Sequence, residues 1–160
     1  MNYEENKYWL WLSYLPYMWY DKANKYMSVF NNPEEIYKAS EETLKKVGIF
    51  TEQEIYNILS SKKIINIEEK WNQMLKKEIK FVTINDEKYP DKLRIYDDKP
   101  LWLYYKGQLP ENDEKLVGMV GARNCSQYGK SMAEHLSSKL ALYSIGVVSG
   151  MARGIDVACH

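Results

Sequence analysis

The clearest hydrophobic pattern of the chain lies in its last third, where two short apolar runs flank a stretch with helical periodicity. Residues 116–120 and 145–148 have the apolar composition of buried strands. Between them, residues 126–143 are predicted to form a helix, because apolar side chains recur at four-residue spacing: Met132, Leu136 and Leu140. A strand, a helix and a strand within about thirty residues indicate a parallel βαβ unit, whose right-handed crossover brings both strand ends to one edge of the sheet.

The first part of the chain has helical patterns instead, with several separate helix starts. Asn32, followed by a proline and two acidic residues, has the features of a helix cap and first turn. Ser40 is placed to cap a short helix. Thr51 and Glu54 have the spacing of a capping box for a helix that runs to about residue 60. These signals predict a bundle of short helices.

A glycine turn, Val47-Gly48-Ile49, separates two of these helices. We interpret Gly48 as the residue that ends a helix in a small SAM-like bundle, because this explains the pattern without a ligand. The alternative is the hairpin of a helix-hairpin-helix module, which presents backbone amides to DNA phosphates.

Helical periodicity stops near residue 75, and short β-like runs follow at residues 79–84 and 101–105. We therefore predict an α/β protein with a boundary near residue 78. A helical SAM-like domain, residues 1–78, is followed by the first part of a Rossmann-like parallel sheet domain, residues 79–160. Parallel sheets need several crossovers to cover both faces, so we expect this second domain to be incomplete at its C-terminus, with further strands beyond residue 160.

Aromatic residues are concentrated near the N-terminus: Tyr8, Trp9, Trp11, Tyr14, Tyr17, Trp19, Tyr20 and Tyr26. Stacking on nucleobases is one use for such rings, but binding sites of that kind combine aromatic rings with neighbouring Lys and Arg, which are few here. Tyr8, Leu12, Leu15 and Trp19 fall at helical spacing, and a small bundle needs large side chains to fill its core. We therefore predict that the aromatic residues pack in the core.

Composition and charge limit the class of protein. The chain is 45% hydrophobic and 28% charged, which is typical of an ordinary globular protein, and it holds no apolar run of eighteen residues and no basic-then-apolar leader. We expect a cytoplasmic protein without a membrane partner, whose two cysteines are inert thiols. The 22 basic residues balance the 22 acidic ones, which argues weakly against nucleic-acid binding. From residue 115 onward, however, five basic residues face two acidic ones, a local excess of +3.

Two glycine-rich, arginine-bearing loops follow the two predicted strands. Glycine lets the backbone approach an anion, the N-terminus of the next helix presents free N–H groups, and each arginine adds a fixed charge. We predict a phosphate site at this edge of the sheet. Its candidate residues are Gly121, Ala122, Arg123, Ser126, Gly150, Met151, Ala152, Arg153, Gly154 and Asp156.

The candidates differ in the role expected of them. The N–H of Gly121 is placed to contact a phosphate oxygen, and Arg123 to bind phosphate through two guanidinium nitrogens. Ser126 is expected to cap the following helix, Arg153 to reach phosphate or solvent, and the small residues of the second loop to let an extended ligand lie against the chain. We interpret Asp156 as a carboxylate bonded to loop amides. A catalytic or metal role with His160 is disfavoured, because no third ligand or nucleophile is identifiable.

Four segments in order resemble the DprA/Smf family of DNA-processing proteins: the Tyr89-Pro90-Asp91-Lys92-Leu93 stretch, the Pro100 to Gly107 stretch, and the two glycine loops, the second of which continues to His160. The resemblance covers residues 79–160 and is looser before them. It implies binding of single-stranded DNA, delivery of that strand to a RecA-type recombinase during natural transformation, a homodimer in the full-length protein, and no enzymatic reaction, cofactor or metal. Ala122 departs from the Ser or Thr usual in the family, which removes a hydroxyl from the first loop.

Two other classes remain open from the sequence. The chain lacks both the Gly-x-Gly-x-x-Gly fingerprint and the Gly-x-x-x-x-Gly-Lys-Ser/Thr loop, which disfavours dinucleotide binding and ATP hydrolysis. A nucleotide-processing enzyme that resembles the Rossmann-like phosphoribohydrolases is the strongest alternative. An interaction module without its own ligand is the third possibility.

Overall fold

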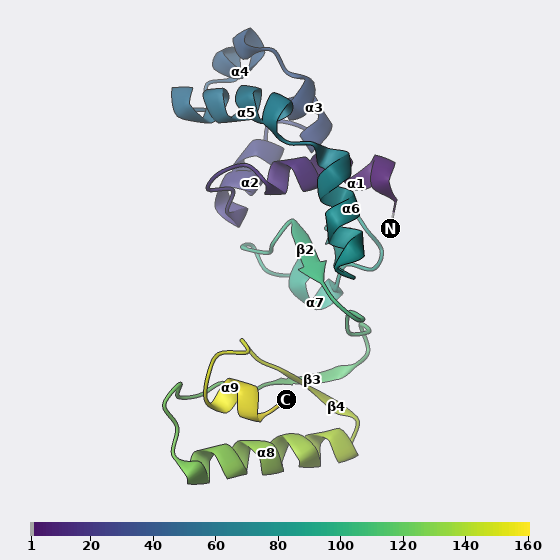
Figure 1. The fold of residues 1–160 in the computed structure, drawn as a ribbon, viewed down its shortest axis with the longest axis vertical. Helices are drawn as coiled ribbons and strands as arrows, with labels where there is room; N and C mark the ends of the chain where they lie inside the picture. Colours follow the sequence, from purple (N-terminus) through teal and green to yellow (C-terminus); the bar gives the residue numbers. More distant parts are fainter. Residues whose placement is uncertain (1) are drawn as a thin grey trace. The chain divides into compact units, whose positions relative to one another are not determined.

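The computed structural model describes residues 2–160, which form two compact units (Figure 1). Unit 1 ends at Leu109 and unit 2 begins at Pro110. Within the described part of the chain, no helix is both long and apolar enough to cross a bilayer.

Unit 1 contains a bundle of six helices followed by two strands and a short helix. The bundle consists of α1 (Tyr3–Ser13), α2 (Tyr20–Met27), α3 (Pro33–Lys38), α4 (Glu41–Val47), α5 (Glu52–Ile64) and α6 (Ile67–Lys76). The strands are β1 (Lys80–Thr83) and β2 (Trp102–Tyr105), with α7 (Asp91–Arg94) between them. The end of helical periodicity near residue 75 agrees with the end of α6.

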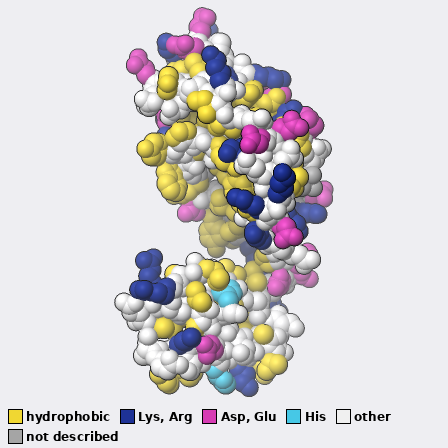
Figure 2. Space-filling model, viewed as in Figure 1, with side chains coloured by type: hydrophobic (Ala, Val, Ile, Leu, Met, Phe, Trp, Pro, Cys, Tyr) yellow, Lys and Arg dark blue, Asp and Glu magenta, His cyan; other side chains and the backbone are white. Residues whose placement is uncertain are grey.

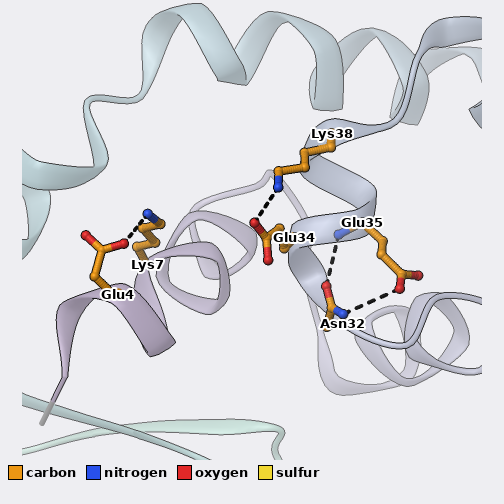
Figure 3. Close-up of polar contacts among 6 residues, drawn as sticks. All are labelled: Glu4, Lys7, Asn32, Glu34, Glu35 and Lys38. Carbon is orange, nitrogen blue, oxygen red and sulfur yellow. Dashed lines mark hydrogen bonds and ion pairs between the residues drawn. The ribbon is translucent and has the colours of Figure 1, made fainter.

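The helix starts predicted from local sequence are confirmed. The side chain of Asn32 accepts a hydrogen bond from Glu35 N at 3.0 Å, and Glu34 pairs with Lys38 at 2.7 Å one turn later, as Figure 3 shows. Ser40 caps α4. Each of these caps satisfies a backbone donor that an α-helix leaves free in its first turn.

The α4–α5 connection also follows its local sequence. Gly48 lies in the left-handed region at φ 74° and ends α4, as the glycine C-cap interpretation predicts. Thr51 and Glu54 form the reciprocal capping box, and α5 continues to Ile64, further than the expected residue 60.

The two strands of unit 1 form an antiparallel hairpin that packs on the helices. Lys80 pairs with Tyr105 and Thr83 with Trp102. Phe81 belongs to the same core cluster as the helices, and the rings of Trp9 and Trp102 lie 6.3 Å apart. The hairpin is therefore part of the helical unit, and the division between units lies after it. The boundary that we predicted near residue 78 marks instead the change from helices to strands.

The aromatic residues divide between the core and the surface. Trp9, Trp11 and Tyr26 are buried, with the rings of Trp11 and Tyr37 edge-to-face at 5.0 Å, so core packing is confirmed for these side chains. For Tyr14, Tyr17, Trp19 and Tyr20 the prediction is wrong, since their side chains are exposed. The helix that carries Leu12 ends at Ser13, so the apolar spacing does not continue to Trp19, which lies at the N-cap of α2.

Unit 2 is the predicted βαβ unit followed by a short helix. It consists of β3 (Lys115–Gly118), α8 (Gln127–Leu142), β4 (Ile145–Val148) and α9 (Ile155–Ala158). The two strands are parallel, with Lys115 opposite Ile145 and Gly118 opposite Val148. The α/β class and the crossover helix are confirmed.

The burial of unit 2 is lower than predicted. The strands are exposed or half-buried, Val120 lies beyond β3 and is exposed, and Leu136 on α8 is 51% exposed. In α8 only Ala133 is buried. Within the described residues, this two-stranded sheet has only α8 and α9 beside it, so its surfaces are incompletely covered.

Candidate nucleic-acid interface

Two loops leave the same edge of the parallel sheet in unit 2. Loop 1 comprises residues 119–126, between β3 and α8, and loop 2 comprises residues 149–154, between β4 and α9. Met119 N donates to Val148 O at 2.9 Å, so strand pairing continues to the point where the loops begin. The parallel pairing therefore brings the two glycine loops together, as the βαβ pattern predicts.

Three hydrogen bonds join loop 1 to loop 2 and the start of α9. Asp156 Oδ1 accepts from Gly121 N at 3.2 Å, and Ile155 N donates to Ala122 O at 3.3 Å. The guanidinium of Arg153 donates to Asn124 Oδ1 at 2.8 Å. The loops thus form one connected structure.

The glycines of the two loops permit this close contact. Gly154 has φ 99°, and a Cβ added there would lie 2.2 Å from Ala122 O. A Cβ added at Gly121 would lie 2.7 Å from the side chain of Ile155. We predicted that small residues leave room for an extended ligand, but at these two glycines the room is filled by the facing chain.

Asp156 is a structural carboxylate, as its position at the start of a helix predicts. It is only 7% exposed and bonds the N–H of Gly121. The predicted contact of this N–H with a phosphate oxygen is therefore not available in this conformation, because Asp156 already accepts its hydrogen bond. Ser126 likewise caps α8 by accepting from Gly129 N at 3.1 Å, which confirms its expected capping role.

Other backbone donors of loop 1 remain open. Among the described residues, none accepts a hydrogen bond from the N–H groups of Ala122, Arg123 and Asn124, and all three residues are exposed. They precede α8, a helix of 16 residues whose N-terminus carries partial positive charge. Open amides next to a helix N-terminus are a favourable environment for an anion.

Three cations belong to this region. The Arg123 side chain is exposed and makes no ion pair or side-chain hydrogen bond with other described residues. Arg153 and Lys130 line a shallow hollow of about 410 Å³ together with Cys125, Gly154, Val157 and Ala158. Lys130 is only loosely paired with Glu134, at 3.9 Å. The local basic excess seen in the sequence is thus partly gathered around the two loops.

The side chains of His160 and Asp156 have different hydrogen-bond partners. His160 Nε2 lies 2.7 Å from Ser149 Oγ, whereas the Asp156 carboxylate bonds Gly121. Across residues 2–160, no three His, Cys, Asp or Glu side chains gather as metal ligands. Both cysteines are free thiols, Cys159 buried and Cys125 half-buried.

With this geometry established, comparison with known proteins decides the family. The family described as DNA recombination-mediator protein A matches residues 80–160, just over half of the chain. The chain belongs to this family. The resemblance drawn from the four sequence segments is confirmed, and the matched region contains both loops of the candidate interface.

Individual relatives extend the similarity beyond the matched region. Protein Smf of Borreliella burgdorferi is 26% identical over 151 residues, 93% of this chain and 47% of the relative. DNA processing protein DprA of Bacillus subtilis is 34% identical over 83 residues, 51% of this chain and 28% of the relative. The crystal structure of DNA processing protein A from Streptococcus pneumoniae superposes with a TM-score of 0.58 at 26% identity, covering all of this chain and 52% of that one. The chain therefore spans about half the length of these relatives, or less.

Sequence reasoning missed two side chains of the interface. Lys130 lies four residues after the cap Ser126, so helical spacing alone predicts its place in the first turns of α8. Asn124, which holds Arg153, had no signal in the sequence, because its partner is 29 residues away.

Proposed function

We propose that this chain binds single-stranded DNA through its backbone phosphates, at loop 1, loop 2 and the first turns of α8. The observation that carries the proposal is Arg123, an exposed and unpaired arginine on a loop whose neighbouring amides have no partner among the described residues. A guanidinium matches phosphate with two parallel hydrogen bonds, and the open amides supply further donors. Membership of a family of DNA recombination mediators supports DNA as the source of those phosphates.

The other candidate residues have supporting roles in this proposal. Arg153, held by Asn124, and Lys130 contribute charge along the hollow beside α8. Gly121, Gly150, Met151, Ala152 and Gly154 form the two loop backbones, and Asp156 fixes their spacing. Ala122 offers no hydroxyl, so the first loop binds through amides and Arg123 alone. Phosphate contacts of this kind hold a strand without reading its bases.

We further propose that binding serves recombination during DNA uptake, with delivery of the bound strand to a RecA-type recombinase. The relatives named as DNA processing proteins support this wider role. In the proposal the full-length protein is a cytoplasmic homodimer, and the chain binds DNA without converting it or any other substrate.

Binding of a fluorescein-labelled oligothymidine, followed by fluorescence anisotropy, tests the proposal. We expect the chain to bind it and unlabelled duplex DNA to compete poorly. Replacement of Arg123 by alanine should weaken binding about tenfold or more, since a hydrogen bond to a charged group contributes roughly 1.5–3 kcal/mol. The loss should be similar for oligonucleotides of different sequence.

The alternative enzyme class gives a different result in the same samples. Absence of oligonucleotide binding, together with release of free base from a nucleoside monophosphate, would replace DNA binding with a phosphoribohydrolase-like activity. A strong dependence of the Arg123→Ala loss on base sequence would contradict phosphate recognition.

A further inference from the structure

The corner between α1 and α2 exposes four aromatic rings within seven residues. Tyr14, Tyr17, Trp19 and Tyr20 are 41%, 77%, 72% and 41% exposed. We call these four residues the aromatic corner. Figure 2 shows hydrophobic side chains gathered on the flank of unit 1 where Figure 1 draws α2. The aliphatic Leu15, within the same segment, is buried. Pro16 is exposed as well, so the exposed surface of this segment is mainly, and not wholly, aromatic.

Local folding does not account for the residues at two of these positions. Tyr17 has φ 58°, a left-handed conformation that is unfavourable for a bulky side chain and that Gly or Asn adopts more readily. Trp19 is the N-cap of α2 and makes no capping hydrogen bond with its side chain, whereas Ser, Thr, Asp or Asn would make one. Both positions therefore present an aromatic ring to solvent where stability favours another residue.

The charges around the aromatic corner complement a polyanion. The Lys70 ammonium lies 5.5 Å from the centroid of the Tyr14 ring. Lys25 is exposed and makes no ion pair with other described residues, while Lys22 is engaged with Glu54 at 2.8 Å. The acidic residue of this segment is Asp21, at the start of α2. Lys70 is thus available beside the Tyr14 ring, and Lys25 is a second unpaired cation on α2.

We propose that the aromatic corner binds the unpaired bases of single-stranded DNA by stacking. Every nucleobase has a π-face, so exposed tyrosine and tryptophan rings next to lysines bind a single strand without a sequence requirement. Paired bases are stacked inside a duplex and do not offer these faces to the corner. This inference rests on the proposed function for the identity of the ligand. It adds a second contact, with the bases, in unit 1, to the contact with the phosphates in unit 2.

Trp19 gives a direct spectroscopic test. Of the five tryptophans, Trp9, Trp11 and Trp71 are buried and Trp102 is partly buried, so Trp19 is the most accessible to a base. We expect oligothymidine to quench the tryptophan emission of the chain. An abasic oligomer of equal length has the same phosphates without bases, and it should bind at the loops of unit 2 without this quenching.

Two substitutions remove two of the four rings, and each introduces a residue that the local backbone favours. Trp19→Ser introduces a preferred N-cap, and Tyr17→Asn introduces a residue that tolerates the left-handed conformation. The double variant should lose the quenching and bind oligothymidine about tenfold or more weakly, with unchanged affinity for the abasic oligomer. Tyr56→Ser is the matched control, because Tyr56 is an exposed tyrosine on α5, outside the corner. It should bind as the unmodified chain does.

The outcomes separate this inference from the proposed function. If oligothymidine binds and the double variant behaves like the Tyr56→Ser control, base stacking is overturned and phosphate binding stands. In the Arg123→Ala variant, quenching should persist at higher oligothymidine concentration. Complete loss of quenching in this variant would show that the aromatic corner makes no contact of its own with DNA. If sedimentation shows the unmodified chain to self-associate and the double variant to be monomeric, with equal DNA affinity, the corner is a protein contact instead.

Discussion

The Asp156 carboxylate accepts a hydrogen bond from the backbone N–H of Gly121 at 3.2 Å, across 35 residues of sequence. This bond joins the loop after β3 to the helix after β4, so the two arginine-bearing loops are held at a fixed spacing. The spacing of Arg123 and Arg153 therefore depends on a residue that is itself buried.

Replacement of Asp156 by alanine should destabilise unit 2, because it leaves the N–H of Gly121 without its partner. This N–H is only partly buried, so the loss should be that of an ordinary hydrogen bond, about 0.5–1.5 kcal/mol, which urea denaturation would measure. Asp156→Asn is the matched control, since it keeps an acceptor oxygen and should lose less. Equal losses for the two variants would show that the negative charge matters and not the hydrogen bond.

Gly154→Ala should be more damaging than an ordinary glycine substitution. The new Cβ would lie 2.2 Å from Ala122 O, and the backbone φ of 99° is one that side chains rarely adopt. We expect a loss of more than about 1 kcal/mol in the free energy of unfolding. At Gly118 a Cβ meets nothing within 4 Å, so Gly118→Ala serves as the control and should unfold at a similar urea concentration to the unmodified chain.

The capping box of α5 should make the stability of unit 1 depend on pH. Partial burial raises the pKa of Glu54. The hydrogen bonds from Lys22 and from Thr51 lower it by more than burial raises it, so the pKa lies below its ordinary value. A lowered pKa stabilises the fold above the unfolded value of about 4.3, and this contribution is lost as the pH falls through the folded value.

Glu54→Gln should therefore cost about 1 kcal/mol at pH 7 and little at the acid end of the titration. Chemical denaturation of both chains across a pH series would measure this difference. Glu52, in the same turn and without an ion pair among the described residues, provides the control Glu52→Gln. A loss for Glu54→Gln that stays constant with pH would contradict the role of its charge.

A buried hydrogen bond connects two helices of unit 1. Trp11 Nε1 donates to Ser61 Oγ at 2.9 Å, and both side chains are buried. Ser61→Ala should cost about 1–3 kcal/mol, since the indole N–H loses its acceptor inside the core. The neighbouring Ser60 is only half-buried, so thermal unfolding of Ser60→Ala should show a clearly smaller effect.

The features predicted correctly from the sequence are those fixed by chemistry within a few residues. Asn32, Ser40 and Thr51 cap their helices, and Gly48 ends one, because each acts on backbone groups within one turn. The βαβ unit was also predictable, since two apolar runs and a periodic stretch between them define it.

The errors arise where distant segments decide the outcome. Trp19 has the right spacing for a core position, yet the helix that sets the spacing ends before it. Gly121 and Gly154 have the composition of a ligand loop, but much of their need for glycine comes from the facing chain, which the sequence pattern does not locate. In physical terms, periodicity predicts which element forms and not what packs against its ends.

The salt dependence of oligothymidine binding by Arg123→Ala tests the central claim most directly. Each phosphate contact releases counterions, so the logarithm of the binding constant falls linearly with the logarithm of salt concentration, by about 0.7 per contact for a single strand. Lys139→Ala serves as the control. It removes an equal charge from an exposed lysine that lies about 18 Å along α8 from the first residue of the helix, Gln127. We predict that Arg123→Ala weakens binding and lowers the slope by about 0.7, while Lys139→Ala changes neither. Equal effects of the two variants, or an unchanged slope for Arg123→Ala, would contradict a phosphate site at these loops.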